Sequence, residues 1–120
     1  MLGIDIVQIN RIEKACKNPA FPARVFTDSE LAYYRSGGGR AETLAGIYAL
    51  KEAAAKALGT GFRGFGPKDV EIAHDKSGAP RVVFHGPALA LFNQTGAKSV
   101  ECSVSHEKEY AAAVCLILIL

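Results

Sequence analysis

The stretch from Gly46 to Gly61 reads Gly-Ile-Tyr-Ala-Leu-Lys-Glu-Ala-Ala-Ala-Lys-Ala-Leu-Gly-Thr-Gly. Alanine, leucine, lysine and glutamate dominate it, and these are the strongest helix formers. Gly59 stands where the helix should end, because glycine readily adopts the left-handed conformation that closes many helices. On a 3.6-residue period the apolar residues of this region fall on one face: Leu44, Ile47, Tyr48, Ala54, Ala55 and Leu58. The stretch therefore predicts one long helix whose apolar side packs against the rest of the chain.

Three charged residues of this helix need an explanation. Glu52 and Lys56 lie four residues apart and are neighbours at the edge of the apolar face, where a solvated pair contributes only about 0.2–0.5 kcal/mol. Lys51 falls inside the apolar stripe, so its ammonium group needs a partner or a path to water. It could reach a phosphate group or pair with a buried acid.

The remaining sequence predicts short strands and shorter helices. Alternation of apolar residues predicts strands near residues 2–7, 70–74, 81–85, 99–105 and 110–120. Helices are expected over residues 9–17, over 28–35 behind a Thr27–Glu30 capping box, and from Pro87 to Gly96, with prolines at positions 19 and 22 breaking the first one. The last strand is apolar on both faces, which predicts cover on both sides, one of them another subunit. We therefore expect a single α+β domain over residues 1–120, with a small, mostly antiparallel sheet packed against one long helix.

Composition excludes several classes of protein. A net charge of +2 is too small for a nucleic-acid-binding surface. The sequence contains no run of about 18 apolar residues, so no membrane span is expected. The first residues lack the basic segment of a signal peptide. Three cysteines without C-x-x-C spacing favour reduced thiols in the cytoplasm.

Two further positions are candidates for chemistry. Asp5 lies in the first strand between apolar residues, so it either caps the following helix or presents a carboxylate to a cation. His106 follows the fourth strand in a turn, where ligands are often contacted. Residues 59–64 match G-x-G-x-x-G, but they close a helix instead of opening one, which excludes the dinucleotide-binding fingerprint. Their glycines are more consistent with a backbone that approaches a ligand or a neighbouring segment.

Four motifs occur together in order along nearly the whole chain. They are Gly3-Ile4-Asp5-Ile6-Val7, then Tyr48-x-x-Lys51-Glu52-Ala53-x-x-Lys56, then Gly59-Thr60-Gly61, and finally Ser103-Val104-Ser105-His106 before Glu109-Tyr110-Ala111. Together they resemble the holo-acyl-carrier-protein synthases, the short bacterial type of 4′-phosphopantetheinyl transferase.

The resemblance implies an enzyme of fatty acid biosynthesis that transfers phosphopantetheine from coenzyme A to a serine of an apo acyl carrier protein and releases 3′,5′-ADP. It implies that Asp5 and Glu52 are magnesium ligands and that Lys56 contacts phosphate. It further places His106 near the nucleotide and Arg11 on the helix that meets the acidic carrier. The expected set of nucleotide-binding and catalytic residues is completed by Lys51, Gly59, Gly61 and Arg40. Members of the family are trimers with active sites at subunit interfaces. Either Glu52 or a metal-bound water could take the serine proton.

The chain departs from the motif at two positions. Tyr48 stands where the motif usually has phenylalanine or tryptophan, and Ile47 stands where the members compared carry an arginine that helps to hold the nucleotide. Arg40, two helical turns earlier, is the best substitute for that arginine. The alternatives are a non-catalytic nucleotide-binding or carrier-docking module on the same fold, and a metal-dependent phosphohydrolase.

Overall fold

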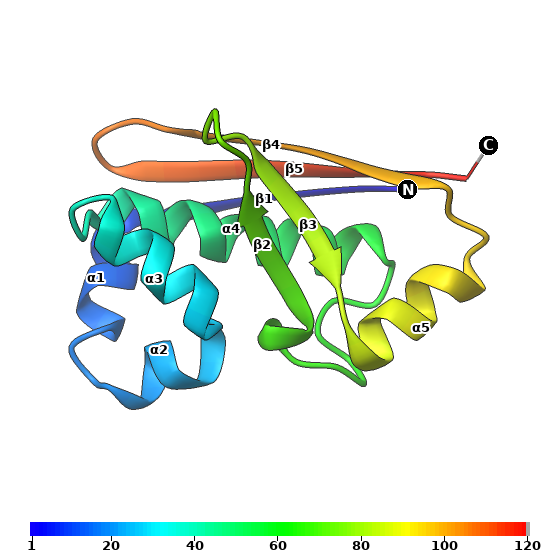
Figure 1. Cartoon of the computed structure of the whole chain (residues 1–120), viewed down its shortest axis with the longest axis horizontal. Helices are drawn as coiled ribbons and strands as arrows, with labels where there is room; N and C mark the ends of the chain where they lie inside the picture. The colour runs from blue at the N-terminus through cyan, green and yellow to red at the C-terminus, as the bar shows by residue number, and fades with distance from the viewer. Residues whose placement is uncertain (120) are drawn as a thin grey trace.

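The computed structural model describes residues 1–119 and shows two antiparallel sheets (Figure 1). The larger sheet has the strand order β1-β5-β4, formed by β1 (Leu2–Gln8), β5 (Tyr110–Leu118) and β4 (Ser99–His106). The smaller one is a hairpin of β2 (Val70–His74) and β3 (Pro80–Phe84). The predicted α+β class with antiparallel strands is confirmed, although the strands divide between two sheets instead of forming one.

Helix α4 (Ala41–Ala57) runs along one face of the larger sheet. The β2–β3 hairpin crosses α4 on another side of the helix (Figure 1). Three short helices gather at one end of the molecule: α1 (Ile9–Ala15), α2 (Ala20–Val25) and α3 (Asp28–Ser36). The other connections are a 3-10 turn, η1 (Pro67–Asp69), and α5 (Gly86–Gln94). Most of α4 is buried, so its packing organises the core around it.

Local signals account for several element boundaries. The Thr27 hydroxyl accepts a hydrogen bond from the Glu30 amide, and the Glu30 carboxylate accepts one from the Thr27 amide, so the predicted capping box begins α3. Gly59 has a φ of +91°, as expected for the glycine that ends α4. Pro22 does not break a helix as predicted. It lies in the first turn of α2, where a missing backbone donor costs nothing.

The contact between β1 and α4 is unusually close. A Cβ atom on Gly3 would overlap the Ala53 carbonyl oxygen and lie 2.7 Å from the Ala57 nitrogen, so only glycine fits there. The side chains on the same side of β1, Asp5 and Val7, therefore lie against α4. The strand carries the predicted carboxylate directly onto the helix that carries Glu52 and Lys56.

The opposite face of the larger sheet is apolar and open. Leu2, Ile4 and Ile6 of β1 are 64%, 67% and 66% exposed. In β5 the burial alternates, with one face under α4 and Leu116 on the open side. Within one chain β5 is covered on one side, and cover of its other side by another subunit stays a prediction. That prediction extended to residue 120, which lies outside the described residues.

Candidate functional site

Asp5 and Lys56 form an ion pair at the junction of β1 and α4. The Lys56 Nζ lies 2.9 Å from Asp5 Oδ1 and also donates a hydrogen bond to the Ile4 carbonyl at 3.1 Å. Lys56 remains about half exposed, so its ammonium group is accessible to a ligand. The sequence spacing placed Lys56 beside Glu52 on the helix edge, and the fold adds Asp5 as its ion-pair partner.

Asp5 and Glu52 line one cavity of about 330 Å³ between α1, β1 and α4. Arg11, Tyr48 and Phe21 line the same cavity. Two carboxylates from a rigid strand and a rigid helix suit Mg²⁺, which binds one or two carboxylates together with water and substrate phosphates. Within residues 1–119 there is no cluster of three or more His, Cys, Asp or Glu side chains that could hold a metal by themselves. The residues present therefore fit a metal that is shared with a phosphate substrate.

Tyr48 lies one helical turn before Glu52 and faces the same cavity. Burial raises the pKa of the Tyr48 hydroxyl, and the neighbouring Glu52 carboxylate raises it further. The hydroxyl consequently stays protonated and is available as a hydrogen-bond donor.

Lys51 does not reach a ligand, and the expectation that it binds substrate is wrong. Its Nζ lies 2.9 Å from Glu30 Oε2 and donates to the carbonyl oxygens of Pro67 and Val70, both at 2.8 Å. The side chain is 1% exposed, and these acceptors use all three of its donors. Burial lowers the pKa of Lys51, while the Glu30 carboxylate opposes that shift. Of the two alternatives left open by the sequence, the structure selects the buried acid.

The Glu30 carboxylate is equally well satisfied. Beyond Lys51 it accepts hydrogen bonds from the Thr27 amide at 2.8 Å and from the Ile72 amide at 2.7 Å. The capping box that is visible in the sequence explains the first of these bonds. The other two depend on how α3, α4 and β2 pack, so sequence reasoning missed this role of Glu30.

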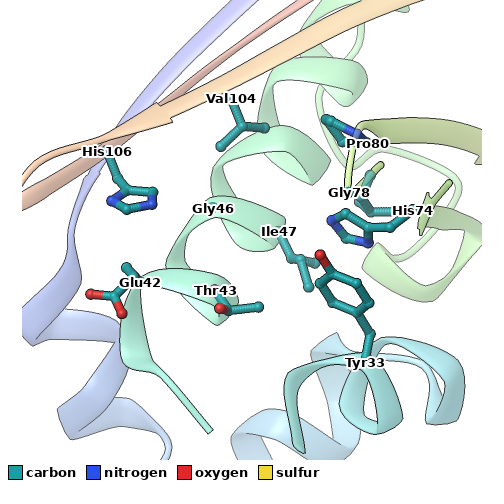
Figure 2. Close-up of a pocket in the computed structure, with 11 residues that line it drawn as sticks. Tyr33, Glu42, Thr43, Gly46, Ile47, His74, Gly78, Pro80, Val104 and His106 are labelled. Carbon is teal, nitrogen blue, oxygen red and sulfur yellow. The ribbon is translucent and has the colours of Figure 1, made fainter. Parts of the chain in front are cut away.

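A second cavity, of about 210 Å³, lies between α4, β4 and the hairpin (Figure 2). His106 and Glu42 stand at one end of it, and Tyr33 and His74 stand at the other (Figure 2). The rings of Tyr33 and His74 are stacked, with centroids 3.7 Å apart. Burial lowers the pKa of His74 against the opposing charges of Glu30 and Asp75.

The walls between these two ends are mainly apolar, with Ile47, Ile72, Pro80 and Val104. No lysine or arginine is among the residues that line this cavity. Arg40, the proposed substitute for a nucleotide-binding arginine, is outside the cavity. It is 71% exposed and its Nε lies 4.0 Å from an oxygen of Glu42, a residue of the cavity wall.

The glycines after α4 lie in neither cavity lining. Gly59 and Gly61 have φ values of +91° and +63°, and a Cβ atom on either would meet nothing within 4 Å. The Gly61 amide donates to the Ala55 carbonyl and closes the helix end. Their conformation requires glycine for the turn, and the open space beside them leaves backbone accessible next to Lys56.

The expected site residues thus form two groups within one chain. Asp5, Arg11, Glu52 and Lys56 lie around the first cavity, whereas His106 lines the second. Asp5 of the first group lies on β1 and His106 lies on β4, and these strands are opposite edges of the sheet. On α4, positions 48 and 52 point about 120–180° away from positions 43 and 46, since each residue turns the helix by about 100°. Sequence reasoning missed Tyr33 and His74, because their stacking depends on the packing of α3 against β2.

A sequence profile of the 4′-phosphopantetheinyl transferase superfamily matches residues 1–115. The chain belongs to this superfamily. The resemblance that the motifs indicated is therefore confirmed over nearly the whole chain.

Individual relatives agree with the superfamily match. The holo-(acyl-carrier-protein) synthase of a Thermoanaerobacter species is 41% identical over 119 residues, which are 98% of this chain and 86% of that protein. The crystal structure of the Helicobacter pylori synthase in complex with coenzyme A matches with a TM-score of 0.85 at 33% identity, covering 98% of this chain and 99% of that one. The Neisseria meningitidis synthase matches with a TM-score of 0.86 at 36% identity, covering 97% and 95%.

Replacing the two lysines of α4 should change the stability of the fold by different amounts. Lys51→Met leaves the Glu30 carboxylate buried without its counter-charge, and we expect the free energy of unfolding to fall by about 3–5 kcal/mol. Lys56→Met, the matched control, removes a half-exposed pair and should change it by at most about 1 kcal/mol. Urea denaturation measures the free energy of unfolding of both variants. Equal losses of stability would contradict the assignment of Lys51 as a buried structural residue.

Proposed function

We propose that this chain is a magnesium-dependent phosphopantetheinyl transferase that moves 4′-phosphopantetheine from coenzyme A to a serine of an apo acyl carrier protein. The observation that carries the proposal is the pair of carboxylates, Asp5 and Glu52, in one cavity with Lys56 beside them. The names of the relatives and the coenzyme A complex of one of them support the same substrates. The second product would be 3′,5′-ADP, and the process served would be fatty acid biosynthesis in the cytoplasm.

Asp5 and Glu52 would hold the magnesium ion, which supplies charge neutralisation at the pyrophosphate. The carrier serine oxygen attacks the phosphorus that bears the pantetheine arm, and the bond from that phosphorus to the bridging oxygen breaks. The bonding electrons leave with 3′,5′-ADP. Lys56 faces the negative charge that develops there, which explains an accessible ammonium group beside a carboxylate. Within the chain, Glu52 is the candidate acceptor for the serine proton.

The separation of the two cavities supports an active site shared between copies of the chain. A nucleotide held near His106 on β4 and a pyrophosphate held near Asp5 on β1 would come from two subunits that meet at the sheet edges. Such a head-to-tail contact closes into a ring, and three copies give the proposed homotrimer. The open apolar side of β1, with Leu2, Ile4 and Ile6, is the surface such a ring would bury. Sedimentation equilibrium measures how many copies of the chain assemble.

No helix of residues 1–119 is long and apolar enough to span a membrane.

The transfer assay tests the central proposal. The chain is incubated with coenzyme A, Mg²⁺ and an apo acyl carrier protein, and mass spectrometry follows the carrier. We expect phosphopantetheine on the serine with the wild type, and at least a hundredfold slower transfer with Asp5→Asn or Glu52→Gln, because a carboxylate that neutralises phosphate charge is lost (a factor of 100 is about 2.7 kcal/mol). Leu89→Ser on the exposed side of α5 is a control for general damage.

Three results would contradict the proposal. Coenzyme A binding without any transfer would favour a non-catalytic module, and release of 3′,5′-ADP without a carrier would favour a phosphohydrolase. Full activity of both carboxylate variants would remove the metal assignment.

Carrier docking is proposed at α1. Arg11 lines the first cavity, and the exposed Lys14 and Lys17 continue the basic surface along the chain. Arg11→Glu should slow association with an acidic carrier and flatten its dependence on salt, because electrostatic steering is screened by ions. Stopped-flow association rates at several salt concentrations measure this. An unchanged slope would place docking elsewhere.

Nucleotide selectivity is expected to be weak in this chain. The lining of the second cavity holds Ile47 and no lysine or arginine. A hydrogen bond to a charged group contributes roughly 1.5–3 kcal/mol, and each 1.4 kcal/mol is about tenfold in affinity. Discrimination of coenzyme A from dephospho-coenzyme A should therefore be about ten- to a hundredfold lower than in arginine-bearing relatives.

The KM ratio for the two nucleotides separates the contributions of two residues. The KM for dephospho-coenzyme A divided by the KM for coenzyme A should rise in Ile47→Arg. The same ratio should fall in Arg40→Ala if Arg40 has partly replaced the missing arginine. A ratio that stays constant in both variants would show that the 3′-phosphate is recognised by other residues.

A further inference from the structure

The two proposed metal ligands are held differently. Asp5 is fixed by the Lys56 ammonium group at 2.9 Å and by its place on β1. Glu52 makes no ion pair within residues 1–119, although it projects from a helix into the same cavity. A carboxylate on two flexible side-chain bonds needs a partner to keep one oxygen directed at a ligand.

Tyr48 is the side chain in position to provide that partner. It precedes Glu52 by four residues on α4, so the two side chains are neighbours on one helix face. Both line the cavity, and the Glu52 carboxylate is close enough to raise the pKa of the Tyr48 hydroxyl.

The Tyr48 ring is itself held in place. It packs against Phe21, with ring centroids 6.0 Å apart, and Phe21 packs edge-on against Phe26 at 6.2 Å. Phe26 is 1% exposed, so this row of rings ends in the core. The hydroxyl is therefore presented from a fixed position, which a donor on a flexible side chain would not achieve.

We propose that Tyr48 is a positioning residue whose hydroxyl donates a hydrogen bond to one oxygen of Glu52 and leaves the other oxygen directed toward Asp5 for a divalent cation. The inference rests on the proposed function, in which Asp5 and Glu52 hold that cation. It adds a hydroxyl donor that the residues usual in the motif lack, because phenylalanine has no donor and tryptophan carries its donor on the indole nitrogen. The ring would serve packing in every case, and the hydroxyl would serve the metal.

The test removes the hydroxyl and keeps the ring. Tyr48→Phe is compared with Tyr34→Phe, which removes a hydroxyl beside a different cavity. Binding of Mn²⁺, as a spectroscopic substitute for Mg²⁺, is measured by electron paramagnetic resonance with saturating coenzyme A and no carrier protein, because the metal is expected to be shared with the substrate phosphates. Loss of an outer partner of a metal ligand typically weakens metal binding by about 10–100-fold. We expect about tenfold weaker binding in Tyr48→Phe, no change in Tyr34→Phe, and unchanged melting temperatures in both.

Kinetics give a second, independent readout. The KM for Mg²⁺ should rise about tenfold in Tyr48→Phe, while kcat at saturating Mg²⁺ stays within about twofold of the wild type, because the hydroxyl orients a ligand and takes no part in the transfer. A dissociation constant for Mn²⁺ within twofold of the wild type would overturn the inference, as would weaker binding that is matched by a lower melting temperature.

Failure of the inference is distinguishable from failure of the proposed function. A wild type that transfers phosphopantetheine and a Tyr48→Phe variant that binds Mn²⁺ equally well would refute the positioning role alone. A wild type that binds no Mn²⁺ and transfers nothing would refute both.

Discussion

The close approach of β1 to α4 is the constraint on which the candidate site depends. Because Gly3 has no side chain, the strand backbone lies against the helix backbone at Ala53 and Ala57. The helix surface there is made of alanines, several of them fully buried, so nothing separates the two elements. Two residues beyond Gly3, on the same face of the strand, Asp5 reaches Lys56. A larger residue at position 3 would move the carboxylate away from both Glu52 and Lys56, whatever residues surrounded it.

A second constraint acts on the other side of α4. Lys51 and Glu30 join the helix to α3, to the backbone at Pro67 and Val70, and to the Ile72 amide of the hairpin. A buried ion pair is a weak source of net stability, because desolvation offsets much of the attraction. Its effect here is geometric. It fixes the hairpin that forms one wall of the second cavity relative to the helix that forms the other. Lys51, which the motif suggests could face a ligand, thus shapes the second cavity from inside the core.

The parts of this structure that local rules control were predictable from the sequence. The capping box at Thr27 and the closing glycine at position 59 act within a few residues, and α3 begins and α4 ends where these signals predict. Pairing over long distances was not predictable. Alternating strands do not reveal that β2 and β3 form a separate sheet, and nothing near Lys51 in the sequence identifies Glu30 as its partner. The grouping of Asp5 with Glu52 came from the family resemblance, since a strand and a helix some 47 residues apart share no periodic signal.

The two departures from the family motif occupy adjacent positions on α4 but face different cavities. Ile47 lines the cavity with His106, and Tyr48 lines the cavity with Asp5. Replacing an arginine by isoleucine removes a cation from the wall of the cavity with His106. Replacing a phenylalanine by tyrosine adds a hydrogen-bond donor to the cavity with Asp5. In the proposed site, the change at position 47 would weaken recognition of the nucleotide's negative charge, whereas the change at position 48 would strengthen the hold on the cation that neutralises the pyrophosphate. Because coenzyme A contacts both cavities in the proposed site, a better-ordered metal would compensate for part of the binding free energy lost at the nucleotide. A single turn of one helix would then have shifted recognition from the 3′-phosphate toward the metal-bound pyrophosphate, where the chemistry takes place.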